Sequence, residues 1–152
     1  MSSATGDRGR IPATAALGLS IAGLLLSAYL TFEHFTDSET LACADSGAVN
    51  CLKVTTSSFS VIFGVPVAVM GLAYFVGLTF LCLPIDPVRH WHRLRIAATG
   101  AGTLMVLWLI YVELFRVNAI CLWCTGVHLV TVSSLAAVLW WRETSPTPAN
   151  VR

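Results

Sequence analysis

Charge is scarce in this chain. Only 11% of its 152 residues are Asp, Glu, Lys or Arg, whereas a soluble domain carries about 25%. So few charges cannot coat a water-facing surface. The net charge is +1 and no basic stripe is present, which argues against nucleic acid as a partner. The sequence also lacks internal repeats and a linker to a second domain, so we expect a single domain.

Apolar residues fill the space that charges leave. They make up 56% of the chain, and the mean hydropathy is +0.76. A helix needs about 20 apolar residues to cross a bilayer, and unpaired strand edges cannot face lipid. We therefore expect an all-α membrane protein: a four-transmembrane-helix bundle with a cysteine-bearing extracytoplasmic loop between its first two helices. The expected spans are residues 11–35, 63–83, 94–115 and 120–141.

Prolines and one asparagine mark the expected helix ends. Pro66 suits the first turn of the second helix, and Pro84 and Pro87 follow its other end. Asn118 is a plausible N-cap for the fourth helix. Cys82, near the end of the second span, is interpreted as a small core residue. The first apolar run is long, and three more follow it, so we do not expect a cleaved signal peptide.

The basic residues predict the orientation. Seven lie before the first span, around the second connection or after the last span, which predicts cytoplasmic tails at 1–10 and 143–152 around a membrane domain at 11–142. Residues 36–62 and the Val117-Asn118 turn then face outward, where disulfides persist. Only Lys53 and Arg116 lie on that side. The seven cytoplasmic arginines are Arg8, Arg10, Arg89, Arg93, Arg95, Arg142 and Arg152.

Cys121 and Cys124 form a CxxC at the start of the last span. At spacing i and i+3 on a helix they share one face and can close a disulfide. The helix N-terminus stabilises a thiolate, which is the nucleophile in disulfide exchange. Cys124 is expected to lie about 4–5 Å deeper than Cys121. Cys121 is therefore suited to exchange with another thiol, and Cys124 to meet a ligand dissolved in lipid.

Cys43 and Cys51 lie in the outer loop with seven residues between them, so the loop can fold back and close a small ring. A mobile dithiol over a fixed dithiol predicts an electron relay from a soluble partner to a membrane carrier. Two other interpretations stay open. The four cysteines could form a zinc site, although the wide spacing and oxidising compartment argue against a metal. They could also form two structural bridges in a small membrane scaffold.

An ordered set of motifs resembles the bacterial, single-domain branch of the vitamin K epoxide reductase family. The resemblance covers residues 27–130. It includes Ala28-Tyr29-Leu30-Thr31 with His34, and Cys43 followed by Gly-Ala-Val-Asn-Cys ending at Cys51. It continues with Val54 and Ser57 ahead of Phe63-Gly64-Val65-Pro66, and it ends with Ala119-Ile120-Cys121-Leu122-Trp123-Cys124.

The resemblance implies a four-helix bundle around a quinone pocket in the bacterial cytoplasmic membrane. It implies a thiol:quinone oxidoreductase that reoxidises a thioredoxin-fold protein and reduces menaquinone or ubiquinone. Cys43 and Cys51 would be the shuttle pair, and Cys51 would form a transient disulfide with Cys121. Cys124 would face the quinone. Many relatives carry a fused thioredoxin-like domain that this chain lacks, so the partner is expected to be a separate protein.

Several residues keep two interpretations. Ser57 matches a family position near the pocket, on a short amphipathic segment, but it could equally be a helix N-cap. His128 stands where vertebrate members have a tyrosine; it could bind the quinone or a neighbouring helix. Trp123 could pack on the quinone or shield the disulfide. Glu113 is expected to pair with Arg116 as an interfacial anchor.

Two alternative assignments share features with this chain. A quinone-epoxide (vitamin K epoxide) reductase would use the same relay, although His128 in place of tyrosine weakens that inference. A different family of four-helix disulfide generators, the disulfide bond formation protein B group, carries its CxxC in the first outer loop and its second pair later. The order is reversed here, which argues against that group.

Overall fold

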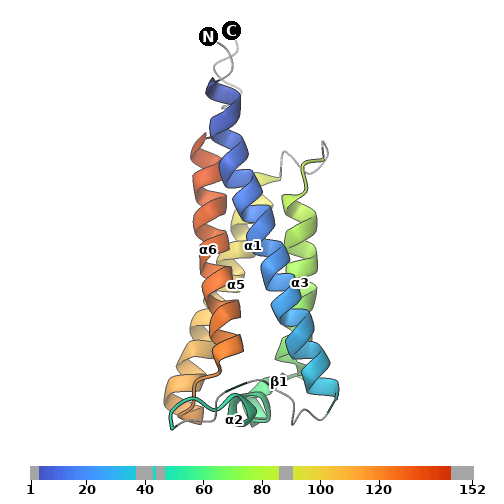
Figure 1. Cartoon of the computed structure of the whole chain (residues 1–152), viewed down its shortest axis with the longest axis vertical. Coiled ribbons are helices and arrows are strands. Elements are labelled where there is room, and N and C mark those ends of the chain that lie inside the picture. Colours follow the sequence, from blue (N-terminus) through green and yellow to red (C-terminus); the bar gives the residue numbers. More distant parts are fainter. Residues whose placement is uncertain (1–3, 37–42, 44–46, 86–90, 145–152) are drawn as a thin grey trace.

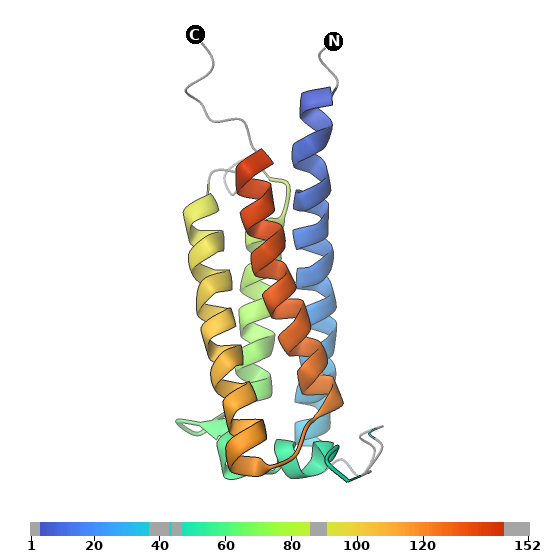
Figure 2. The same cartoon turned by 90° about the vertical axis from the view of Figure 1, so that its left-hand side faces the viewer.

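The computed structural model describes residues 4–36, 43, 47–85 and 91–144. Helices α1 (Ala4–Phe35), α3 (Val67–Cys82), α5 (His92–Val112) and α6 (Leu122–Thr144) run side by side, as Figures 1 and 2 show. The start of α1 and the end of α6 lie at the same end of the molecule. The short helix α2 (Cys51–Thr55) lies across the opposite end. Helix α2, which begins at Cys51, is thus remote from the start of α1 and the end of α6.

Within the described residues, three helical segments are long and apolar enough to cross a membrane: Arg10–Phe35, His92–Val117 and Leu122–Thr144. The expectation of a largely helical chain is confirmed, and these segments correspond to the first, third and fourth expected spans. The second expected span corresponds to α3, which has 16 residues. At 1.5 Å per residue α3 is about 24 Å long, shorter than a hydrocarbon core of about 30 Å.

The predicted start of the second span at residue 63 is wrong. Strands β1 (Val61–Ile62) and β2 (Val65–Pro66) form an antiparallel hairpin there. Its two turn residues, Phe63 and Gly64, have φ angles of 52° and 81°. Such left-handed angles are typical of two-residue hairpin turns and end any helix. Pro66 consequently occupies the N-cap of α3 rather than its first turn.

The prediction for Asn118 is also wrong. Beyond α5 the chain forms one π-helical turn, η2 (Glu113–Val117), which ends at Asn118 with φ 51° and ψ 47°. Asparagine tolerates this left-handed conformation, so it terminates a helix here instead of starting one. Because α6 begins at Leu122, Cys121 precedes the helix rather than lying in its first turn.

Helix α1 begins at Ala4, so residues 4–10 of the expected cytoplasmic tail continue the helix beyond the expected span. Helix α6 continues to Thr144, and the rest of the predicted C-terminal tail lies outside the described residues, as do Pro87, Arg89 and Arg152.

Close packing of α1 against α3 and α6 forms the core. Phe75 and Leu78 of α3 and Val138 of α6 are almost completely buried in it. The Phe75 ring lies directly against Gly23 of α1, where a side chain would overlap it. Small residues at such contacts let helices approach closely in a membrane. Cys82 also belongs to this cluster, which confirms its interpretation as a core residue.

Candidate functional site

A main-chain contact joins the loop before Cys51 to the segment before Cys121. The Ile120 N–H donates to the Ala48 carbonyl at 2.9 Å, and the Asn50 N–H donates to the Ile120 carbonyl at 3.1 Å. Val49 and Ile120 thereby form an isolated parallel bridge. Cys51 and Cys121 each follow this bridge within two residues, so the bridge brings the two cysteine pairs together.

The loop pair is closed in the structure. Cys43 and Cys51 form a disulfide with their Cα atoms 6.0 Å apart. Cys51 is the first residue of α2 and is 1% exposed. The Asn50 side chain caps α2 by accepting the Lys53 N–H at 2.7 Å. The loop pair therefore has one cysteine anchored at a capped helix start and packed into the protein.

The second pair is reduced, and Cys121 is the cap of α6. The Cys124 N–H donates to the Cys121 sulfur at 3.2 Å, and the Thr125 N–H donates to the Cys121 carbonyl at 2.8 Å. The side-chain hydrogen bond with Cys124, together with the backbone N–H groups of Cys124 and Trp123, lowers the pKa of the Cys121 thiol against the opposing effect of its burial. Cys121 is therefore the thiol of the pair that ionises first, and it leaves readily as a thiolate when a disulfide that contains it is broken.

This lowered pKa can be measured in a variant in which only Cys121 and Cys124 remain. Raising the pH through the thiol pKa converts thiol to thiolate, which absorbs in the ultraviolet. The midpoint of the first rise in absorbance is expected at a lower pH than for an ordinary cysteine thiol. A further Cys124→Ala change removes the side-chain hydrogen bond and should move that midpoint upward. An unchanged midpoint contradicts the role assigned to Cys124.

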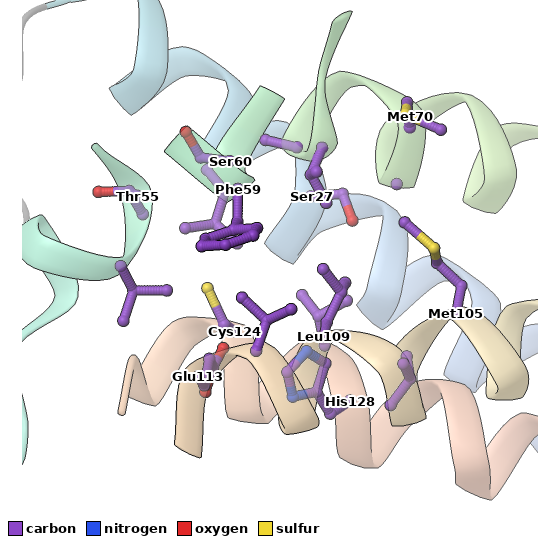
Figure 3. Close-up of a pocket in the computed structure, with 18 of the residues that line it drawn as sticks. Ser27, Thr55, Phe59, Ser60, Met70, Met105, Leu109, Glu113, Cys124 and His128 are labelled. Atoms are coloured by element: carbon purple, nitrogen blue, oxygen red, sulfur yellow. The ribbon is translucent and has the colours of Figure 1, made fainter. Parts of the chain in front are cut away.

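Cys124 borders an apolar cavity of about 260 Å³ between the helices. Figure 3 shows its sulfur at one end of this cavity, with Glu113 and His128 close by and Phe59 across from it. Met70 and Met105 lie toward the other end. The cavity is slightly smaller than typical ligand pockets of about 300–1,000 Å³ and shares their apolar lining with few polar groups.

Two of the three expected pocket residues line the cavity, and the third does not. Ser57 and His128 both line the cavity, and His128 is 5% exposed. Ser57 also stands at the N-cap of the 3₁₀ turn η1 (Ser58–Ser60), but its hydroxyl donates to the Val54 carbonyl at 2.8 Å instead of capping. Trp123 is not among the lining residues. Its ring packs against that of Tyr29 with centroids 4.7 Å apart.

Two lining residues were missed as pocket residues. The Tyr74 hydroxyl of α3 is buried without a hydrogen-bond partner in the described part of the chain. Glu113 is 6% exposed, and no ion pair joins it to Arg116, whose guanidinium lies 5.5 Å from the Phe59 ring centroid. The expected Glu113–Arg116 pair is thus wrong. Ionisable residues at membrane depth are functional candidates by default, and this signal could have found Glu113.

The observed geometry of the two cysteine pairs suits thiol–disulfide exchange. Cys43 and Cys51 are bonded to each other, and within the described residues no three His, Cys, Asp or Glu side chains converge as metal ligands would. The second pair touches an apolar cavity on one side and the loop segment on the other.

Apolar helices that can span a membrane, together with two adjacent cysteine pairs, define a class of membrane oxidoreductases acting on thiols. The chain belongs to the vitamin K epoxide reductase family, whose model matches residues 14–139. Membership implies a membrane oxidoreductase linked to quinones, and the disulfide and its neighbouring cysteines agree with it.

Proposed function

We propose that the chain is a membrane thiol:quinone oxidoreductase that supports disulfide formation in exported proteins. It would reoxidise a separate extracytoplasmic thioredoxin-fold protein and pass the electrons through two cysteine pairs to a membrane quinone. The observation that carries this proposal is the position of Cys121–Cys124, with Cys124 on the apolar cavity and Cys121 beside the bridge to Cys51.

The cysteines would act in the order of their contacts. A partner thiolate attacks the Cys43–Cys51 disulfide and leaves oxidised, so the loop pair becomes a dithiol. The Cys51 thiolate then attacks an oxidised Cys121–Cys124 pair at Cys121 and forms a transient Cys51–Cys121 disulfide. Cys43 resolves this bond, which restores the loop disulfide and leaves Cys121 and Cys124 as thiols. The structure has this oxidation state.

The cavity residues fit a quinone. The walls are largely apolar, which suits a ring dissolved in lipid. The unpartnered Tyr74 hydroxyl can donate a hydrogen bond to a carbonyl, and His128 and Ser57 add polar groups. A bound quinone supplies the two-electron acceptor for the Cys121–Cys124 dithiol. The protein holds the ring against Cys124 and limits access of water.

The proposed membrane arrangement includes α3 as a fourth span. Helix α3 is apolar and packs against α1 and α5, which belong to membrane-long segments, and Figures 1 and 2 show it within the same bundle. The positive-inside rule then puts both termini in the cytoplasm and the cysteines outside, in a multi-pass protein of the bacterial cytoplasmic membrane.

The test is a purified reaction of the chain with a reduced thioredoxin-fold donor and a short-chain quinone. Quinone absorbance is followed anaerobically, and donor oxidation is quantified in the same samples. The proposal expects one quinone reduced for each donor disulfide formed. Donor oxidation without quinone consumption, or no reaction with any quinone, contradicts it.

A further inference from the structure

A buried carboxyl lies at the cysteine end of the cavity. Glu113 is the first residue of the π-helical turn η2, is 6% exposed and lines the same cavity as Cys124 and His128. Figure 3 shows Glu113 near Cys124, on the same side of the cavity. Burying an ionisable group in an apolar, membrane-deep site is costly, so its presence needs a reason.

A structural role does not require the charge. The Glu113 carboxyl accepts the backbone N–H of Cys121, a contact that ties η2 to the start of α6. A glutamine oxygen could accept the same hydrogen bond. The neighbouring cation does not pair with it either, because the Arg116 guanidinium lies over Phe59. What only a carboxyl provides at this point is the ability to take up and release a proton.

The backbone of η2 helps to present this side chain. A π-helical turn inserts an extra residue into the helix, and such turns are frequent at functional sites. Here the turn spans Glu113–Val117, and the left-handed Asn118 ends it directly before the segment that carries Cys121. The Glu113 carbonyl also accepts the Ala119 N–H at 3.2 Å. Glu113 is therefore held by both its backbone and its side chain to the chain that positions the CxxC.

We propose that Glu113 relays a proton in the quinone step, an inference that rests on the proposed function. Closing the Cys121–Cys124 disulfide releases two electrons and two protons, and reducing a quinone to a quinol consumes both. The Glu113 carboxylate takes the proton that leaves the Cys124 thiol and delivers it to a quinone oxygen. The carboxylate is regenerated, and the proton from Cys121 completes the balance.

Other ionisable groups surround this carboxyl and must be considered in any pH profile. His34 of α1, Tyr74 of α3, and Cys124 and His128 of α6 line the same cavity. Cys121 lies at the start of α6, Arg116 belongs to η2 itself, and α2, which contacts η2, carries the exposed Lys53.

The first test is a single-turnover reaction of the fully reduced, full-length chain with a short-chain quinone across a range of pH. Glu113→Gln keeps the hydrogen bond to Cys121 but cannot ionise. It is expected to lose about 10²-fold in rate, the lower range for removal of a proton-transfer group. It should also lose the limb of the profile that rises as the carboxyl ionises. Glu113→Asp keeps a carboxyl and should retain this limb at a reduced rate.

The matched control is Glu33→Gln. Glu33 is equally buried, at 4% exposure, but does not line the cavity, so its substitution should leave the rate and the pH profile as in the parent.

A second readout needs no quinone. This test uses chains that keep only Cys121 and Cys124. The negative charge of the Glu113 carboxylate repels the Cys121 thiolate and so raises the pKa of that thiol. Glu113→Gln should therefore lower the pH midpoint of Cys121 thiolate absorbance, whereas Glu33→Gln should not. An unchanged midpoint overturns the proposal, because the carboxyl would then not interact with the thiols that it is said to deprotonate.

The outcomes separate the relay from the proposed function. A parent chain that reduces quinone, together with a Glu113→Gln variant that matches its rate at every pH, overturns the relay alone. A parent chain that reduces no quinone overturns the proposed function and the relay with it. A slow Glu113→Gln variant with a flattened profile and a shifted thiolate midpoint supports both.

Discussion

Replacing Cys124 by alanine is expected to abolish quinone reduction, with a loss of at least about 10³-fold, as when a reacting nucleophile is removed from an active site. Cys124 is the cysteine that borders the cavity, and without it Cys121 has no partner for a disulfide. The partner exchange with the Cys43–Cys51 disulfide does not involve Cys124 and should still occur once, after which the loop pair stays reduced. Quinone absorbance measures the loss, and alkylation of thiols with peptide mapping shows Cys43 and Cys51 remaining as thiols.

The control for this prediction is Cys82→Ala. Cys82 is a free cysteine buried in the helix core, remote from both pairs, so its substitution should preserve quinone reduction. Full activity of Cys124→Ala would favour a membrane scaffold in which the bridges are only structural.

Replacing Ile120 by proline is expected to slow transfer between the two cysteine pairs by about 10²–10³-fold. Proline has no N–H, so the 2.9 Å hydrogen bond to the Ala48 carbonyl is lost. Misplacing reacting groups by about 1 Å costs on the order of 10²-fold in rate. The measurement is a rapid-quench time course of disulfide exchange from reduced Cys43–Cys51 to oxidised Cys121–Cys124.

Two comparisons isolate the main-chain contact. Ile120→Val keeps the N–H and should exchange at nearly the parent rate. In Ile120→Pro, a small dithiol that reduces Cys121–Cys124 directly should still support quinone reduction. If Ile120→Pro exchanges as fast as Ile120→Val, the bridge does not position the pairs.

The pairing of Val49 with Ile120 could not have been predicted from the sequence, because two hydrogen bonds between segments 70 residues apart leave no local pattern. The four cysteines were predictable, since their order and their position beside apolar runs are visible in the chain. Three spans were predictable for the same reason: each contains a long uncharged run. The start of the second span was predicted wrongly because Phe63-Gly64 continues the apolar run in the sequence but forms a turn in the structure.

The cavity was only partly predictable. His128 follows Cys124 by one helical turn, so its presence on the same wall could be derived from helix geometry. Trp123 points to Tyr29 instead, which depends on how α1 packs. Glu113 was misread as an interfacial anchor because spacing to Arg116 suggested an ion pair. The π-helical turn that directs it to the cavity has no recognised sequence signature in this chain.

The central claim is that electrons reach the quinone only through Cys121 and Cys124. The most direct measurement starts from the fully reduced chain, adds a limiting short-chain quinone without oxygen, and maps disulfides by mass spectrometry over time. The account predicts that a Cys121–Cys124 disulfide appears first, in equal amount to the quinol, and that Cys43–Cys51 becomes oxidised only afterwards. Direct oxidation of Cys43–Cys51 in a chain whose Cys121 and Cys124 are both alanine would contradict it.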